Sequence, residues 1–449
     1  MKYSKSILMA AAAALSIASA SAQNVIYITG ATAFRKAANK NLYALFGDKL
    51  YASSGTATNT DSAVGLYFTN CVLSNNAVVD IAVTWTGSEG GIQQVASGTN
   101  NKRVPYFDKA KIDTARPGST LTTGASGRLG LTAPDTTSFT EGTFTSLQKG
   151  LVAFMDSFPG SSRFKPNVKA SDGNVYKSLQ AAAIGVVPYT YIASKGFDTA
   201  FPERNISTGN AQQALESGYI KGNLLTGADA DADITIWTMG RNIDSGSRVI
   251  NHAVNKYGTL TPVVQWKVTA SGGNVTQIEK HPATTLLGIG VALGNNGESS
   301  GSAMAGFMTN SFPSGFANVV SATGESAGAT ANYLIGYSSV ADTLPLVGSG
   351  LVPLKYNGVE GRCYSQTNAT TLDAGYTNIT TGRYPYWGYE FIGYDNTLSG
   401  NANVPVLVNQ LVARIRSLAS TNSDLAPNIA LGDMKVDRSE DGGKQDWNQ

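Results

Sequence analysis

The sequence predicts an α/β protein, because one arrangement of elements recurs along the chain. Three stretches consist of a β-branched strand, a polar loop that carries glycine and a hydroxyl residue, and a helix with an apolar side. Their strands begin near residues 25, 78 and 234. Strands that alternate with helices are typical of folds in which helices cover a mainly parallel sheet. We therefore expect an α/β fold.

The third unit, residues 234–254, has the most informative loop. Its helix is indicated by apolar residues at helical spacing, and Ser245 or Ser247 is expected to cap the first turn. Free N–H groups at a helix N-terminus favour anions, and Arg241 offers a two-pronged donor for a tetrahedral oxyanion. A capped helix beside a surface arginine is the alternative interpretation.

The first two units repeat this chemistry. Thr32 follows the strand that ends at Gly30, and Ser88 lies between glycines that allow close approach of backbone N–H groups. Thr-Gly-Ala after a strand also occurs in dinucleotide-binding folds, but Phe34 and Ala37 stand where the later glycines of that fingerprint would be. Three loops that offer donors and no catalytic base predict a bound anion.

The N-terminus has the pattern of a secretory signal peptide. Two lysines precede an apolar run and a small-residue cleavage site, so cleavage is expected after Ala22. The apolar run is too short to span a bilayer, and no later segment is long and apolar enough. We expect an exported protein, periplasmic or extracellular, that is not inserted in the membrane after cleavage.

Composition excludes some classes of partner. A net charge of +2 argues against a nucleic-acid binder, and 14% charged residues with 49 glycines indicate a loop-rich, neutral chain. The length suffices for two domains or one large two-lobed unit. Cys71 and Cys363 are the two cysteines, and their pairing is an open hypothesis.

Enzyme and metal motifs are weak. The segment 324–328 fits the Gly-x-Ser-x-Gly nucleophile elbow, but His252 and His281 both precede Ser326, contrary to the order of triad residues in that fold. We interpret it as a glycine-rich helix start. The histidines and cysteines lack zinc spacing, and the acidic run 229–233 lacks the glycine of a calcium loop. We expect no enzyme activity, no catalytic residues, no metal and no cofactor.

Three segments, at residues 30–34, 87–94 and 241–248, together resemble the ligand loops of the periplasmic phosphate-binding protein of ABC transporters and its type II solute-binding superfamily. The resemblance implies a two-lobed α/β fold with crossover hinge strands and a central ligand cleft. It implies ligand contacts from Thr32, Ala33, Phe34, Ser88, Arg241, Ser245, Gly246 and Ser247. The family's aspartate after the second loop is not evident here, and Asp108 and Asp135 are the nearest substitutes.

The resemblance also implies a division of the chain. After the signal peptide at 1–22, the first lobe is expected at 23–145 plus 340–422, the second lobe at 146–339, and a polar C-terminal tail at 423–449. The expected function is capture of a small oxyanion, phosphate first, by a monomer that delivers it to an ABC-type permease. The alternative is a non-transport surface or extracellular protein that uses the same fold for adhesion or assembly.

Overall fold

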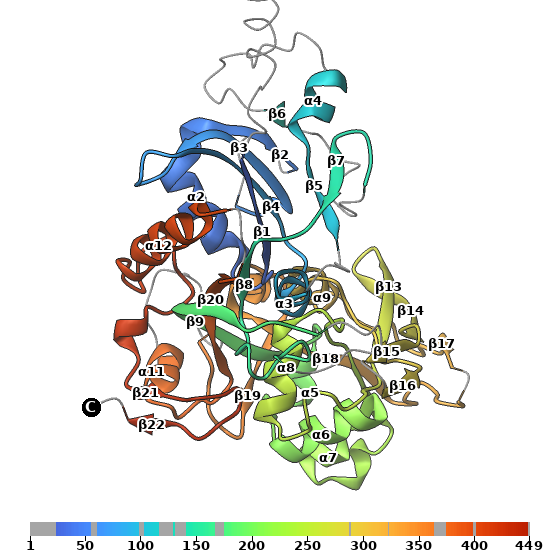
Figure 1. Ribbon diagram of the computed structural model, residues 1–449. Helices are drawn as coiled ribbons and strands as arrows, with labels where there is room; N and C mark the ends of the chain where they lie inside the picture. Colours follow the sequence, from blue (N-terminus) through green and yellow to red (C-terminus); the bar gives the residue numbers. More distant parts are fainter. Residues whose placement is uncertain are drawn as a thin grey trace, which may run out of the picture.

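A mixed β-sheet of 13 strands runs through the computed structural model (Figure 1). The structure describes residues 24–54, 61–97, 103–115, 129–130, 141–166, 175–286, 289–321, 323–362, 374–397 and 401–447. The strand order is β11-β12-β18-β9-β20-β8-β1-β4-β3-β2-β6, and β10 and β19 branch from it. The α/β class is thereby confirmed. The sheet has two parts, called here the first and second lobe, which meet at β9 and β20.

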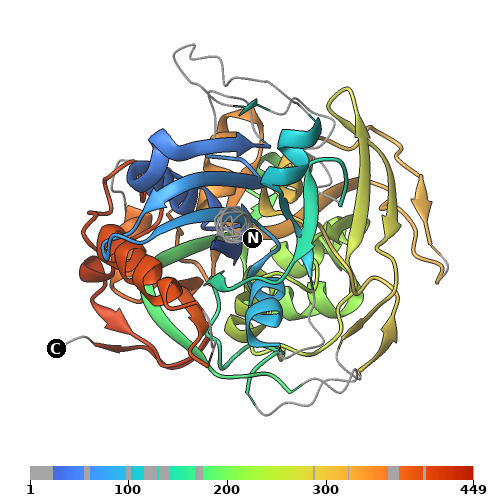
Figure 2. The ribbon, with the colours of Figure 1, turned by 45° about the horizontal axis from the view of Figure 1, so that its top comes forward.

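The first lobe is built on three parallel strands, β1 (Val25–Gly30), β4 (Val78–Thr84) and β8 (Val152–Met155). Two antiparallel strands, β3 (Gly65–Val72) and β2 (Leu50–Ser53), extend it. Helices α2 (Arg35–Phe46) and α12 (Asn403–Arg416) pack together beside this sheet, and α3 (Ser88–Ala96) packs on β1 and β8 (Figures 1 and 2). The strands are almost wholly buried because helices cover them, which explains their continuous apolar runs.

The second lobe contains the parallel pair β12 (Ile234–Thr238) and β18 (Ala331–Ser339), with β11 (Tyr219–Lys221) antiparallel at its edge. Its helices include α6 (Thr208–Ser217), α8 (Gly246–Val254) and α9 (Gly301–Phe307). The hairpin β13 (Trp266–Ser271) and β14 (Asn274–Lys280) turns at Gly272 and Gly273 and extends to one side (Figure 1).

Two long strands connect the lobes. Strand β9 (Leu179–Ala193) pairs first with β20 (Trp387–Asp395) of the first lobe and then, from Tyr189 onward, with β18 of the second. Aromatic rings pack at this junction: Tyr191 stacks on Tyr356 at 5.4 Å between ring centroids, and Tyr189 on Tyr386 at 5.3 Å. The expected two-lobed architecture with crossover strands is confirmed.

The remaining elements are short. They are η1 (Gly47–Lys49), β5 (Val104–Phe107), α4 (Lys109–Ala115), β6 (Leu129–Gly130), β7 (Thr145–Gln148), α5 (Phe197–Ala200), β10 (Asn205–Ile206), α7 (Asn223–Thr226), η2 (Asp229–Asp231), β15 (Thr284–Leu286), β16 (Ile289–Ala292), β17 (Val319–Val320), α10 (Val340–Thr343), η3 (Leu344–Ser349), β19 (Val352–Tyr356), α11 (Ala374–Thr380), η4 (Leu431–Asp433), β21 (Val436–Asp437) and β22 (Asp446–Trp447).

Residues 146–156 form strands although the spacing of their apolar residues predicts a helix. The apolar spacing indicates a helix, but the chain forms β7 and β8 with a break at Gly150. A Cβ at Gly150 would lie 2.8 Å from Thr29, so the chain passes too close to β1 for a larger residue. Because β8 pairs with β1 and β20, it belongs to the first lobe and not to the second.

The segment after Asn422 also differs from the polar tail that we expected. Leu425 and Ile429 are fully buried, and Ile429 exchanges two backbone hydrogen bonds of 2.9 Å with Val186 on β9. Apolar residues in this otherwise polar segment are thus anchored to a crossover strand.

Some expectations fall on residues that the structure does not describe. The signal peptide at 1–22 and Cys363 lie outside the described residues, whereas Cys71 is buried in β3. Of the helices that the structure does describe, none combines the length and apolar character that crossing a bilayer demands.

Candidate functional site

Three polar residues lie where the parallel strands of the first lobe end. Thr32 follows β1, Ser88 follows β4 and Asp156 follows β8. The carboxyl ends of parallel strands share one edge of a sheet, which is where α/β proteins bind ligands. Gly30, at the end of β1, has φ of +126°, and a Cβ there would lie 2.0 Å from the carbonyl oxygen of Phe154. Only glycine therefore fits this turn.

Arg241 reaches this edge from the second lobe, where it follows β12. Its side chain is 1% exposed, and its Nη2 donates hydrogen bonds of 3.1 Å to Thr32 Oγ1 and to the carbonyl oxygen of Ser299. Nε donates to the carbonyl oxygen of Glu298 at 3.1 Å, and Nη1 to Ser247 Oγ at 3.4 Å. The guanidinium thus connects the two lobes.

The start of α8 completes this side of the site. Ser245 is the N-cap, and its Oγ accepts a hydrogen bond from Arg248 N at 3.4 Å. Of the two serines proposed as caps, Ser245 therefore has this role, and Ser247 Oγ lies 2.6 Å from Ser245 Oγ. Gly246 faces the first lobe so closely that a Cβ would lie 1.8 Å from Asp156 Oδ1 and 2.7 Å from Ser88 Cβ.

Asp156 is the site residue that sequence reasoning missed. It is 2% exposed, its Oδ2 accepts a 2.8 Å hydrogen bond from Tyr189 Oη, and its Oδ1 has no hydrogen-bond partner within the described residues. Burial raises its pKa, and the Tyr189 hydroxyl and the charge of Arg241 oppose this shift. Its signal in the sequence was an acid directly after a buried strand.

The two aspartates suggested from the sequence do not supply this group. Asp108 lies at the start of α4, where its carboxylate accepts hydrogen bonds from Ala110 N and Ser146 Oγ. Asp135 lies outside the described residues. The structure therefore brings Asp156, and not Asp108, beside Ser88 and Gly246.

Ala33 and Phe34 lie next to Thr32 but are packed in the protein. Both are buried, and the Phe34 ring stacks on Phe154 with ring centroids 6.3 Å apart. Their side chains stabilise the turn before α2. A contact of either residue with a ligand stays a prediction.

The lobes also contact each other directly. The backbone N–H groups of Glu89 and Gly90, at the start of α3, donate to the carbonyl oxygen of Asp244 at 3.0 and 3.4 Å. Arg163 pairs with the Glu89 carboxylate at 3.3 Å and donates to the carbonyl oxygen of Ile243. Part of the first turn of α3, which we expected to face a ligand, is thus bonded to the second lobe.

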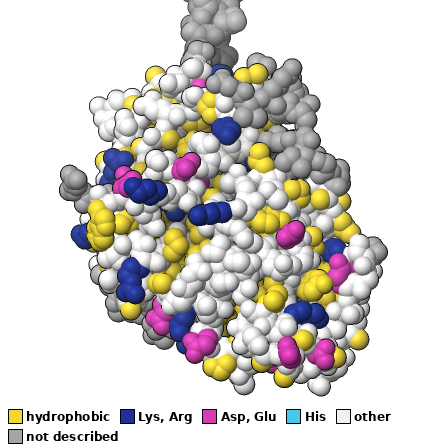
Figure 3. All heavy atoms as spheres, turned by 90° about the horizontal axis from the view of Figure 1, so that it is seen from below, with side chains coloured by type: hydrophobic (Ala, Val, Ile, Leu, Met, Phe, Trp, Pro, Cys, Tyr) yellow, Lys and Arg dark blue, Asp and Glu magenta, His cyan; other side chains and the backbone are white. Residues whose placement is uncertain are grey.

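Three buried arginines near the site make no close ion pair in the part of the chain that the structure describes. Within the described residues, Arg35, Arg241 and Arg248 form no ion pair, although each is at most 9% exposed. Arg248 donates to Asn295 instead, and burial lowers its pKa to about 10. Unpaired buried charge is costly, so this region favours an anion. On the outer face in Figure 3, by contrast, charged side chains of both signs are dispersed.

No protein-family model matches this chain, and no curated protein matches its sequence. Several solved structures are similar to it in fold. The chain is similar to a phosphate ABC transporter substrate-binding protein with bound phosphate from Clostridium perfringens, with 11% identity, TM-score 0.40, and coverage of 90% of this chain and 96% of that one.

It is also similar to PstS from Borrelia burgdorferi, with 10% identity, TM-score 0.34 and coverage of 88% and 93%. A third similar structure is an ABC-type phosphate transport receptor from Vibrio cholerae, with 11% identity, TM-score 0.36 and coverage of 87% and 93%. Because these scores are low, the side chains of this molecule have to indicate what it binds.

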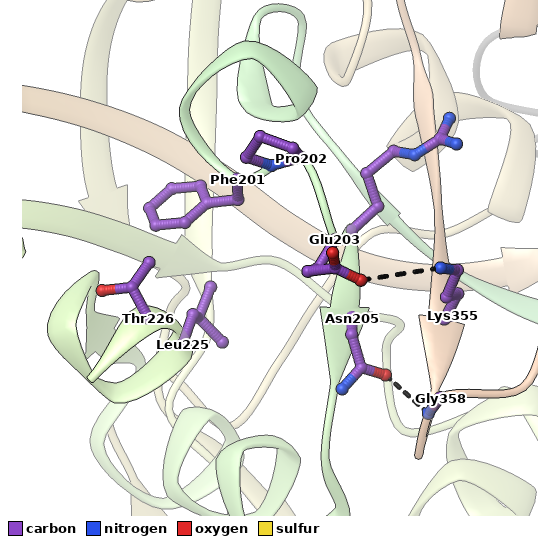
Figure 4. Close-up of a pocket in the computed structure, with 9 residues that line it drawn as sticks. Phe201, Pro202, Glu203, Asn205, Leu225, Thr226, Lys355 and Gly358 are labelled. Carbon is purple, nitrogen blue, oxygen red and sulfur yellow. Dashed lines mark hydrogen bonds and ion pairs between the residues drawn. The ribbon is translucent and has the colours of Figure 1, made fainter. Parts of the chain in front are cut away.

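A cavity of about 460 Å³ lies on the second lobe (Figure 4), and Arg241 is not among the residues that line it. Its polar groups bond one another: Glu203 pairs with Lys355 at 3.8 Å, and Asn205 Oδ1 accepts from Gly358 N at 2.7 Å. Since these groups already have partners, this cavity lacks the unpaired buried charge found around Arg241.

The segment 324–328 has neither of the structures considered from the sequence. It is a loop before β18, so it is neither a strand-to-helix elbow nor a helix start, and Ser326 is exposed. Glu325 pairs there with Lys280 at 2.7 Å. In the described parts of the chain, no group of three or more His, Cys, Asp or Glu residues is arranged to hold a metal ion.

Proposed function

We propose that this chain is an exported solute-binding protein that captures a small oxyanion, with phosphate as the first candidate, between its two lobes. The observation that carries the proposal is Arg241, a buried guanidinium without a carboxylate partner in the described residues that donates to Thr32 of the opposite lobe. An anion bound there supplies the missing negative charge and touches both lobes. Such a ligand stabilises the closed arrangement because it gains contacts only when the lobes meet.

Asp156 would select the protonation state of the ligand. Its Oδ1, the atom without a hydrogen-bond partner in the described residues, faces Gly246 at the start of α8. When ionised, this carboxylate accepts a hydrogen bond from a protonated oxyanion such as hydrogenphosphate. When protonated, it donates to a fully deprotonated oxyanion such as sulfate. Burial favours the protonated form, and Arg241 favours the ionised form.

Delivery to an ABC-type permease is the role that the sequence resemblance implies for such a protein, and it forms part of the proposal. Binding rather than catalysis is proposed because the side chains at the site are an arginine, hydroxyls and one acid. Hydroxyl and guanidinium donors replace the water shell of an anion without forming a covalent bond to it.

A second candidate function is favoured by the direct contacts between the lobes. Glu89 N already donates to Asp244 O, and Arg163 holds Glu89 and Ile243 together. A protein whose lobes are joined by its own residues suits a static surface or assembly role. In that case no ligand would be needed to close it.

Isothermal calorimetry of the purified protein against phosphate, sulfate, arsenate and molybdate tests the proposal. We expect one oxyanion to bind. Arg241→Ala should weaken its affinity at least tenfold, since hydrogen bonds from charged groups contribute about 1.5–3 kcal/mol each. Arg416→Ala, on the exposed end of α12, serves as the control. A folded, ligand-free protein that binds none of the four would overturn the proposal and favour the static role.

A further inference from the structure

A groove of about 470 Å³ opens between the lobes beside Arg241. The first lobe contributes Thr32, Arg35 and Trp85 to its walls, and the second lobe contributes Ser299 and Ser302. Pockets that hold small organic ligands have volumes of about 300–1,000 Å³. A tetrahedral oxyanion, with five heavy atoms, fills only part of such a space, so the groove has room for a larger molecule.

The groove is continuous with the proposed anion site. Arg241 Nη2 donates to Thr32 Oγ1 and to the Ser299 carbonyl oxygen, both at 3.1 Å, and both residues line the groove. One edge of the guanidinium therefore lies against the part of the groove wall that Thr32 and Ser299 form. A ligand whose anionic group binds there has its remaining atoms directed along the groove.

Arg35, the first residue of α2, supplies a second cation to the groove. It is 9% exposed, lines the groove, and its Nε has no hydrogen-bond partner within the described residues. Burial lowers its pKa; the charge of Asp342 opposes this shift, and that of Arg241 adds to it. Arg35 and Arg241 repel each other, so an anion shared between them stabilises both, in addition to the Asp342 carboxylate that acts on Arg35.

The walls of the groove carry hydroxyl groups. Ser299 and Ser302 stand on one side, and Ser62 and Trp85 on the other. Hydroxyl side chains both donate and accept hydrogen bonds, which suits a ligand that itself carries several hydroxyls.

We infer that the preferred ligand is a phosphate monoester of a hydroxylated molecule, such as a sugar phosphate, which binds more tightly than inorganic phosphate at the same site. Its phosphoryl group binds between Arg241 and Arg35, and its hydroxylated part lies along Ser299 and Ser302. This inference rests on the proposed function and names the class of ligand for that site.

Calorimetry with glucose 6-phosphate, inorganic phosphate and glucose tests it. We expect glucose 6-phosphate to bind at least tenfold more tightly than phosphate, and glucose not to bind. Arg35→Gln should weaken the binding of glucose 6-phosphate at least tenfold. Ala303→Trp, at an exposed position on the groove wall, should reduce the preference for the ester over phosphate at least tenfold. Ala230→Trp, exposed in η2, is the control that should keep the preference.

The outcomes separate this inference from the proposed function. If phosphate binds through Arg241 but glucose 6-phosphate does not, or if Ala303→Trp leaves the preference unchanged, the inference is overturned and the proposed function stands. If neither glucose 6-phosphate nor phosphate binds to the folded protein, the inference is overturned, and the proposed function stands only if sulfate, arsenate or molybdate binds through Arg241. Thermal unfolding of each variant shows whether a lost affinity reflects lost structure.

Discussion

Tyr189 Oη donates a 2.8 Å hydrogen bond to Oδ2 of Asp156. Tyr189 lies on β9 where its partner strand changes from β20 to β18, and both residues are buried. This bond joins the candidate site to the strand that connects the lobes. The charge of Asp156 therefore bears on the connection between the lobes as well as on the ligand.

Tyr189→Phe is expected to lower the free energy of unfolding by about 1–3 kcal/mol, because it leaves a buried carboxylate oxygen without its donor. It should also raise the pKa of Asp156 further, since the Tyr189 hydroxyl opposes the rise caused by burial. Urea unfolding measures the first effect. Tyr333→Phe is the control, because the structure records no hydrogen bond from that half-buried hydroxyl within the described residues. Equal losses in the two variants would contradict the assigned role of the bond.

Gly246→Ala is expected to separate the lobes. The new Cβ would lie 1.8 Å from Asp156 Oδ1 and 2.7 Å from Ser88 Cβ, and overpacking of this kind costs about 1–3 kcal/mol. Small-angle X-ray scattering should show a larger radius of gyration than in the parent protein. Gly306→Ala on α9 has open space around its Cβ and should leave the radius unchanged. An unchanged radius for Gly246→Ala would show that the lobes are not in contact there in solution.

Arg163→Met is expected to destabilise the protein by about 3–5 kcal/mol, because it leaves Glu89 as an unpaired buried carboxylate. The two side chains are 3% and 0% exposed. Adding Glu89→Gln should recover part of this loss, which urea unfolding of the single and double variants would detect. Lys109→Met breaks an exposed pair with Asp113 and should cost less than about 1 kcal/mol. A double variant no more stable than Arg163→Met would argue against the pair as the cause.

Asp441 is expected to make stability fall as pH rises. Burial raises its pKa to about 6, from an ordinary value of 3.8, so the folded state holds this proton more tightly than the unfolded state does. The contribution is complete below about pH 4 and is lost as pH passes 6, a change of about 3 kcal/mol. The Asp441→Asn variant lacks this pH-dependent contribution to stability. The difference in unfolding free energy between parent and variant, measured from pH 4 to 7, should change by this amount in favour of the variant.

The Arg241 loop could be predicted because its information is local. Strand, polar loop and capped helix lie within one short stretch, and the structure has β12, Ser245 as N-cap and α8 there. Asp156 could not be found in this way. Leu151 and Val152 fit the apolar spacing of a helix, whereas a strand buried on both faces has no alternation that would identify it.

Contacts between residues far apart in the chain could not be predicted from the sequence, for a different reason. Glu89 and Arg163 are 74 positions apart, and nothing in either neighbourhood indicates that they meet. The same holds for Arg35 and Ser299, which line one groove from opposite lobes. Their proximity depends on how β9 and β20 position the two lobes. Local patterns in the sequence do not indicate this arrangement.

The attachment of Ile429 to Val186 has a consequence for how the molecule assembles. The first lobe begins with β1, close to the start of the described chain, yet its sheet also needs β20, and β9 gains a further partner from the segment around Ile429. A chain made from its N-terminus cannot complete that sheet until almost all of it has been synthesised. Pairing over such sequence separations is slow. Strands β11, β12 and β18 of the second lobe all precede residue 340, so they are available for pairing before β20 of the first lobe has been made.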